Sequence, residues 1–265
     1  MIVTLGSVRG SPGVTSWALL LAAGWPAIFD TDRVVLEADV DGGVLGARYG
    51  LGVDPGVVSL IAAMRRSGQP QVPVADHGRA AADRVWLVPG PETAERAHSV
   101  WTGTAEAVAA GLAADDRVWF VDAGRVDASS AVLPFVAAAK LTVLLCRSAH
   151  EDVVQVPSRL EALGIDGPKS AVLVVGKLRH SVDELAAFFG TPTVWNVDES
   201  TELPELAAAV MRPGRARRSW LWRSAVELSA RVAVHTSAPR SVGSDLRTVG
   251  SLNGTVESRF VETES

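Results

Sequence analysis

The chain has 265 residues, with 30 acidic and 25 basic side chains, and its formal net charge at pH 7 is −5. A hydrophobic fraction of 48% with 21% charged residues is typical of a globular protein and excludes an intrinsically disordered chain. The single Cys146 excludes an intramolecular disulfide framework, favours a reducing compartment and is expected to be a buried structural thiol. Only three basic residues are lysines, and none of them precedes Lys140.

Short β-branched or apolar runs alternate with longer segments rich in alanine and leucine. We expect strands at 2–5, 34–37, 84–88, 118–122, 141–146, 171–175 and 193–195. Helices are expected between them at 15–23, 56–66, 100–113, 128–139, 151–163 and 182–189. Several strands are apolar on both faces, which is typical of a parallel sheet covered by helices on both sides. The alternation therefore predicts an α/β fold with a doubly wound, mostly parallel sheet over residues 1–210.

Two regions follow this domain. Residues 211–235 are predicted to form a C-terminal basic amphipathic helix, because Leu221, Ala225, Leu228 and Val232 share one face. Residues 236–265 lack a periodic apolar face and are predicted to be a disordered tail. The apolar stretch 131–146 is shorter than the roughly 20 residues that cross a bilayer, so it is expected to be a helix and a strand.

A glycine-rich loop, residues 6–16, follows the first predicted strand and leads directly into a helix. Backbone N–H groups and the positive end of the helix dipole both favour a phosphate at such a position. A tight turn that holds no ligand is the structural alternative. The residues expected to bind phosphate are Arg9, Gly10, Ser11, Gly13, Val14, Thr15 and Ser16.

The same loop resembles the deviant phosphate-binding loop of the ParA/MinD family of ATPases, K-G-G-x-G-K-S/T. Arg9 stands where that family has its signature lysine, which reaches across a dimer to the phosphates of the partner. Gly10 and Gly13 match two glycines, and Ser11 replaces the third. Thr15 matches the hydroxyl that binds Mg²⁺, and Val14 occupies the place of the phosphate-binding lysine.

Two acidic segments downstream extend the resemblance. Residues 34–43 are similar to the second motif of the family, in which Asp39 would orient the attacking water and Glu37 replaces the first aspartate. Residues 118–122 resemble a Walker B strand that ends in Asp122, a carboxylate near Mg²⁺. The resemblance therefore implies ATP and Mg²⁺ as cofactors, with Asp39 and Asp122 as catalytic residues and with Thr15, Asp39 and Asp122 around the metal. The structural alternative is that an acidic residue ends a strand where the chain leaves the core.

Val14 affects the mechanism that the resemblance implies. A loop lysine normally places a positive charge on the β- and γ-phosphates, and losing one such stabiliser typically costs on the order of 10²–10³ in rate. We therefore hypothesise weak nucleotide binding and slow or absent hydrolysis. The implied function is a positioning or partitioning switch: a homodimer, biased by nucleotide, with a protein partner from a positioning, division or secretion assembly. The alternatives are a nucleotide-free pseudo-ATPase scaffold and a small-molecule ATP-dependent enzyme on a related fold.

A basic cluster with two tryptophans marks the start of the last predicted helix. It is expected either as the solvated end of a docked helix or as a contact with anionic membrane or non-specific DNA through Arg212, Arg215, Arg217, Arg218 and Arg223. The five histidines have no metal-ligand spacing and are expected at the surface. The expected location is cytoplasmic, with peripheral contact at membrane or nucleoid.

Overall fold

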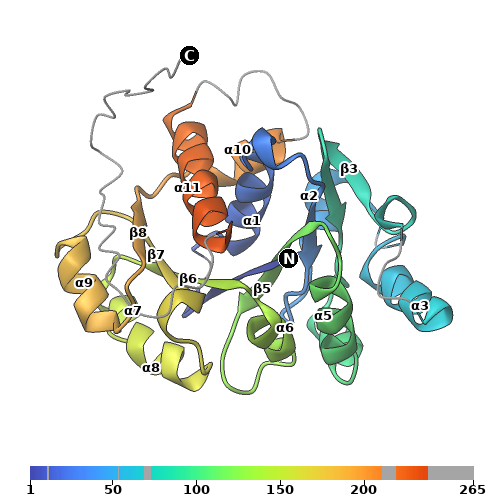
Figure 1. Ribbon diagram of the computed structural model, residues 1–265, viewed down its shortest axis with the longest axis horizontal. Helices are drawn as coiled ribbons and strands as arrows, with labels where there is room; N and C mark the ends of the chain where they lie inside the picture. Colours follow the sequence, from blue (N-terminus) through green and yellow to red (C-terminus); the bar gives the residue numbers. More distant parts are fainter. Residues whose placement is uncertain (11, 53, 69–72, 211–218, 238–265) are drawn as a thin grey trace, which may run out of the picture.

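The computed structural model describes residues 1–10, 12–52, 54–68, 73–210 and 219–237. Within these residues, eight strands form one sheet in the order β3-β4-β2-β5-β1-β6-β7-β8 (Figure 1). Their bounds are β1 Ile2–Ser7, β2 Arg33–Glu37, β3 Arg79–Ala82, β4 Val85–Val88, β5 Val118–Arg125, β6 Leu141–Arg147, β7 Ser170–Val175 and β8 Val194–Val197. Every neighbouring pair is parallel except β3 and β4, which are antiparallel. The predicted α/β fold with a mostly parallel sheet is confirmed.

Helices cover both faces of the sheet (Figure 1). One face packs against α1 Val14–Ala23, α2 Leu45–Tyr49, α10 Leu203–Ala209 and α11 Trp220–Ser237. The other packs against α3 Val57–Ser67, α4 Ala94–Trp101, α5 Ala105–Ala113, α6 Leu133–Ala138, α7 His150–Val153, α8 Val156–Ala162 and α9 Val182–Phe189. Short 3-10 turns occur at Ala27–Phe29, Val74–Asp76 and Gly167–Lys169.

The strands follow the predicted apolar pattern closely. Every residue of β1, β2 and β7 is buried, because helices lie on both sides of these central strands. Within β2, Val34 and Leu36 join the apolar cluster on one face, whereas Val35 joins the cluster on the other. The predicted strands 2–5 and 118–122 are longer than expected and continue to Ser7 and Arg125.

Several predicted helices differ in their bounds. The expected helix 100–113 is two helices, α4 and α5, separated by Gly103 with a φ of 76°. The expected helix 151–163 is also divided, and Pro157 lies in the first turn of its second part, α8. The expected helix 128–139 shortens to α6. The short elements β3, α2 and α10 were not predicted.

The last helix has the apolar face that the spacing of its residues predicts, and it docks on α1 through this face. Leu221, Ala225, Leu228 and Val232 are all buried, and the Ser229 hydroxyl donates a hydrogen bond to the Leu21 carbonyl oxygen at 3.1 Å. The helix ends at Ser237, two residues beyond the predicted limit. Residues 211–218, which include the predicted contacts Arg212, Arg215, Arg217 and Arg218, lie outside the described residues, as does the tail from 238. Within the described parts of the chain, no helix is long and apolar enough to span a membrane.

Candidate functional site

The sheet brings the glycine-rich loop and the acidic segments to one edge. The strand order changes direction at β1, which has β5 on one side and β6 on the other. Ligands of open α/β sheets bind outside the carboxyl ends of the strands at such a point. Glu37 pairs in register with Asp122, and Leu5 pairs with Asp122 from the other side. The ends of β1, β2 and β5 therefore form a single candidate site.

Two glycines shape the loop between β1 and α1. Gly10 and Gly13 have φ values of 52° and 91°, in the left-handed region that favours glycine. A Cβ atom on Gly13 would lie 2.5 Å from Cδ2 of Leu203, so a side chain there would also displace the end of Leu203. Gly13 is also the N-cap of α1 and provides no capping side chain. The first amides of α1, which have no acceptor within the helix, are therefore available to an anion.

Neighbouring strands hold this loop in place. The Val8 amide donates to the Leu145 carbonyl oxygen at 3.1 Å, and the Ser7 hydroxyl donates to the Gly10 carbonyl oxygen at 3.2 Å. From α8, the Arg159 guanidinium donates to the carbonyl oxygens of Val126 at 2.8 Å and Val8 at 3.4 Å. The start of the loop is thus fixed to both β5 and β6, whereas Ser11 lies outside the described residues.

The predicted phosphate-binding residues divide into two groups. Arg9 and Gly10 are exposed, and Thr15 is half-buried. Ser16 is buried, and its hydroxyl accepts a hydrogen bond from Nη1 of Arg48 at 3.3 Å. Val14 is 7% exposed and belongs to the apolar cluster that also contains Leu203. The Val14 side chain is therefore part of the core.

Asp122 is a fully buried carboxylic acid in the interior of β5. Its Oδ1 accepts a hydrogen bond from the Gly124 amide at 3.1 Å, whereas Oδ2 has no hydrogen-bond partner among the described residues. Burial raises the pKa of Asp122 to about 7; the Thr15 side chain and the Gly124 amide oppose the shift, and the charges of Glu37 and Asp39 add to it. Asp122 is inside the core, so the strand-end alternative does not explain it.

Asp39 lies beside Asp122 at the end of β2. A Cβ atom on Gly124 would lie 2.1 Å from Cγ of Asp39, so the absence of a side chain at Gly124 admits this carboxylate. Asp39 Oδ1 accepts a hydrogen bond from the Asp41 amide at 2.9 Å, and burial raises the pKa of Asp39. The structure thus brings Thr15, Asp39 and Asp122 together, and their roles in metal binding and catalysis are proposals.

Glu37 has a different environment. Its carboxylate is buried and accepts hydrogen bonds from the amides of Val44, Leu45 and Gly90 at 2.6, 2.9 and 2.9 Å. Burial raises the pKa of Glu37, and these three amides oppose the shift. A Cβ atom on Gly43 would lie 2.3 Å from Oε2 of Glu37, so the absence of a side chain at Gly43 makes room for the carboxylate. Glu37 therefore joins β2 to the start of α2 and to the loop after β4.

A hollow of about 490 Å³ adjoins the loop at the ends of β6 and β7. Its volume is in the usual range for small-molecule sites, roughly 300–1,000 Å³. Arg147, Lys177 and Arg179 line it together with one acid, Glu199. Nη1 of Arg147 lies 4.0 Å from the position that a Cβ atom on Gly10 would take, so one side chain that lines the hollow also approaches the loop. None of these four residues was predicted as part of the site.

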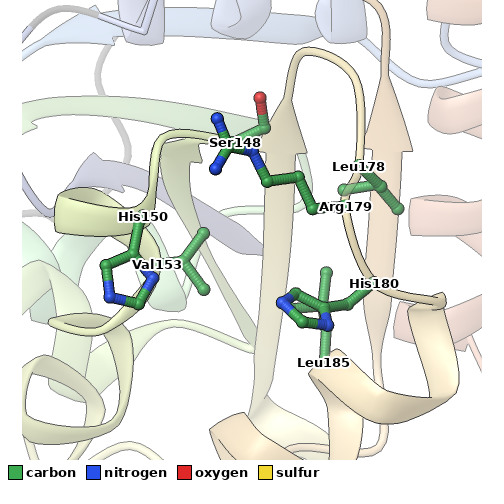
Figure 2. A pocket seen from close by; sticks show the side chains of 7 residues that line it. All are labelled: Ser148, His150, Val153, Leu178, Arg179, His180 and Leu185. Atoms are coloured by element: carbon green, nitrogen blue, oxygen red, sulfur yellow. The ribbon is translucent and has the colours of Figure 1, made fainter.

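A second, smaller hollow of about 30 Å³ shares Ser148, Leu178 and Arg179 with the first. Figure 2 shows His150 and His180 on opposite sides of it, with the guanidinium of Arg179 beside Ser148. Among the residues that the structure describes, no three His, Cys, Asp or Glu side chains are grouped so as to hold a metal ion. Two histidines alone do not make such a site.

A Mg²⁺ ion that binds together with a nucleotide needs fewer protein ligands than such a metal site. It is usually bound through one or two carboxylates together with substrate phosphates and water. The Thr15 hydroxyl and the unpartnered Oδ2 of Asp122 are oxygen ligands of that kind, at the start of α1 where a phosphate would complete the set. The residues therefore fit Mg²⁺ that arrives with a nucleotide.

Three of the five histidines and the cysteine follow the sequence predictions, whereas His235 is half-buried beside Trp195. His98, His150 and His180 are exposed, but His77 is buried and contacts the Ser59 hydroxyl at 3.1 Å. Cys146 is buried in β6, and burial raises the pKa of its thiol to about 12. The cysteine is thus a structural thiol rather than a nucleophile.

The sheet order and the glycine-rich loop before α1 define a doubly wound protein with a ParA/MinD-like P-loop fold. Solved structures of this class resemble the chain along most of its length. The ParA family ATPase from Chlorobium tepidum has a TM-score of 0.68 at 14% identity, covering 87% of this chain and 98% of its own. MinD from Pyrococcus horikoshii, a septum site-determining protein complexed with Mg-ADP, has a TM-score of 0.65 at 14% identity, covering 87% and 95%.

The MinC:MinD cell division complex from Aquifex aeolicus gives a TM-score of 0.63 at 13% identity, covering 94% of this chain and 99% of the matched chain. No protein-family model and no curated protein sequence matches the chain. At these identities the likeness establishes the fold.

Proposed function

We propose that the chain is a nucleotide-biased dimerisation and interaction switch of the ParA/MinD kind, with weak or lost ATP hydrolysis, that acts in positioning or partitioning. The observation that carries the proposal is the buried Asp122, which has an unpartnered Oδ2 and whose carboxyl group interacts with the Thr15 side chain at the end of the glycine-rich loop. The Mg-ADP bound to the Pyrococcus horikoshii MinD supports the assignment of a nucleotide to this class of site.

Each residue of the site has a proposed part in nucleotide binding. The amides at Gly13 and the first turn of α1 hold the phosphates, and the Ser16 hydroxyl lies at the same helix end. Thr15 and Asp122 hold Mg²⁺, which supplies positive charge against the phosphate oxygens when it is bound. Asp39 orients a water molecule. Arg9 is exposed at the loop, which suits contact with the phosphates of a second copy across a homodimer.

Slow hydrolysis follows from the chemistry of the loop. Phosphoryl transfer depends on positive charge close to the β- and γ-phosphates. Val14 provides none, because its side chain is apolar and packs in the core. In the function that we propose, the binding of nucleotide and of partner proteins is therefore more important than the rate of ATP hydrolysis.

The partner is proposed to be a protein of a positioning, division or secretion assembly. In the Aquifex aeolicus structure, MinD is in complex with the cell division protein MinC. The competing contact is an anionic membrane or DNA through the basic start of the last helix, where the described residue Arg223 is exposed. Pelleting with anionic liposomes and binding to DNA fragments, each compared between the wild type and Arg223→Glu, distinguish the two surfaces.

Calorimetric titration with ADP and ATP, each with and without Mg²⁺, tests the proposed function. The wild type is expected to bind both nucleotides with Mg²⁺. Thr15→Val, which replaces the hydroxyl by a methyl group of similar size, is expected to weaken binding by about tenfold or more with Mg²⁺ but not without it. Asp39→Ala is expected to bind normally and to lose any residual hydrolysis. Absence of binding to the wild type would contradict the proposal and favour the nucleotide-free scaffold.

Restoring the lysine gives a separate prediction. Val14→Lys is expected to tighten ATP binding by about tenfold, because the long lysine side chain can extend beyond the apolar cluster to the loop and one charge-assisted hydrogen bond contributes roughly 1.5–3 kcal/mol. Val14→Met serves as the control, because it lengthens the side chain without adding charge. Equal affinities of the two variants, measured by the same titration, would show that position 14 does not face phosphate.

A further inference from the structure

We infer that Arg48 and Arg147 supply, from outside the glycine-rich loop, the phosphate-binding positive charge that Val14 does not provide. The inference rests on the proposed function and names two further ligand-binding residues of that site. One arginine belongs to the helix after β2, and the other to the end of β6. They approach opposite ends of the loop, one at the first turn of α1 and one at Gly10.

Arg48 lies in the last turn of α2 and reaches the first turn of α1. Its Nη1 donates to the Ser16 hydroxyl at 3.3 Å, the one hydrogen bond that the described residues show for Arg48. A guanidinium group has five N–H donors in a fixed fork, so most of them are available to a ligand. The positive charge is therefore held beside the amides that the loop offers to phosphate.

The helix that carries Arg48 is fixed at both ends. At its start, the Glu37 carboxylate accepts hydrogen bonds from the amides of Val44 and Leu45. At its end, the Tyr49 hydroxyl donates to the Ala207 carbonyl oxygen on α10 at 2.6 Å. A short helix of five residues is thus pinned between β2 and α10, and Arg48 is presented to α1 by a defined support.

Arg147 approaches the glycine-rich loop from β6, the strand that lies beside β1. It is the last residue of β6, which pairs with β1 so that Leu145 lies opposite Ser7. Its Nη1 is 4.0 Å from the position of a Cβ atom on Gly10, so the guanidinium lies against the bare backbone of the loop. Arg147 also lines the 490 Å³ hollow, so its side chain lies where the loop and the hollow meet.

The carboxylates of the site do not account for Arg48. Burial and the carboxylates of Glu37 and Asp39 raise the pKa of Asp122, and Arg125 is the cation that acts on Asp39. Arg48 is not among the causes of either shift. A planar guanidinium binds phosphate oxygens through two parallel hydrogen bonds, whereas lysine acts as a point charge. The pair is therefore suited to the diphosphate of a nucleoside di- or triphosphate.

Titrations of the full chain with Mg-ADP and with inorganic pyrophosphate, which lacks base and sugar, test the inference. Arg48→Ala and Arg147→Ala are each expected to weaken both probes by about tenfold or more, as for the loss of a hydrogen bond to a charged group. Arg66→Ala is the matched control: it also removes one arginine, from α3 on the face of the sheet opposite to α1 and α2. It is expected to bind both probes within about twofold of the wild type.

A charge-restoring double variant sharpens the test. Adding Val14→Lys to Arg147→Ala is expected to recover most of the lost affinity for pyrophosphate, because a cation returns to the phosphates by another route. Unchanged midpoints of thermal unfolding show that each variant is folded. A loss of ADP affinity without a loss of pyrophosphate affinity would place an arginine on the nucleoside and overturn its assignment.

The outcomes separate the inference from the proposed function. If the wild type binds both probes and neither arginine variant is weakened, the inference is overturned and the proposed function stands. If only one variant is weakened, the assignment of the other arginine is overturned. If the wild type binds neither probe, the proposed function fails and the inference fails with it.

Discussion

Glu37→Ala is expected to lower the free energy of unfolding by about 4 kcal/mol. The substitution removes the acceptor of three backbone amides, those of Val44, Leu45 and Gly90. Each buried donor that is left without a partner costs roughly 1–3 kcal/mol, and water that enters the space of the lost side chain offsets part of this. Urea unfolding followed by circular dichroism measures the loss.

Two further variants isolate the cause. Glu37→Gln keeps the size of the side chain and one acceptor oxygen but turns an amide group toward a backbone N–H, so it is expected to lose about half as much stability. Glu161→Ala, on the exposed face of α8, makes the same change of charge and is expected to lie within about 0.5 kcal/mol of the wild type. Equal unfolding midpoints for Glu37→Ala and Glu161→Ala would show that the buried carboxylate does not anchor α2.

The strands that sequence predicts well are those with the strongest local pattern. The central strands are apolar on both faces, and only a sheet covered on both sides buries such a run completely. β3 escaped prediction because Arg79–Ala82 contains three alanines and no β-branched residue. Its strand conformation comes from antiparallel pairing with β4, a tertiary contact that no local propensity reports.

The candidate site likewise contains some residues that local sequence patterns predict and others that only the tertiary structure reveals. Gly10, Gly13 and Asp122 were predictable, because a tight loop before a helix and a strand with an acidic residue are local patterns. Arg48 and Arg147 were not, since their approach to the loop depends on the strand order and on the anchoring of α2. A signal for the structural role of Glu37 does exist in the sequence: Gly43 and Gly90 leave the space that its carboxylate fills.

Asp122→Asn is expected to raise the free energy of unfolding at pH 8 by about 3 kcal/mol in the absence of metal. In the folded protein the pKa of Asp122 is about 7, against an ordinary value of 3.8. Between these two values the folded state keeps a proton that the unfolded chain has lost, so stability falls as the pH rises through this window and levels off above it. Each pKa unit corresponds to about 1.36 kcal/mol, and the unpaired buried amide of asparagine cancels part of the gain.

Urea unfolding of both proteins at pH 5, 6, 7 and 8, with a chelator present, measures this difference. The gain is expected to grow from pH 5 to pH 8, because asparagine does not titrate. Asp116→Asn, at an exposed position before β5, is the control and is expected to run parallel to the wild type. Parallel curves for Asp122→Asn would contradict the raised pKa.

The same substitution is expected to act in the opposite direction on ligand binding. An ionised Asp122 is unfavourable in its buried place without a cation, and Mg²⁺ brought by a nucleotide would supply that cation. Asp122→Asn should therefore lose the Mg²⁺-dependent part of its ADP affinity while it gains stability. A purely structural carboxylate would instead lose stability when it is replaced, so the two measurements together distinguish a ligand-binding role for Asp122 from a structural one.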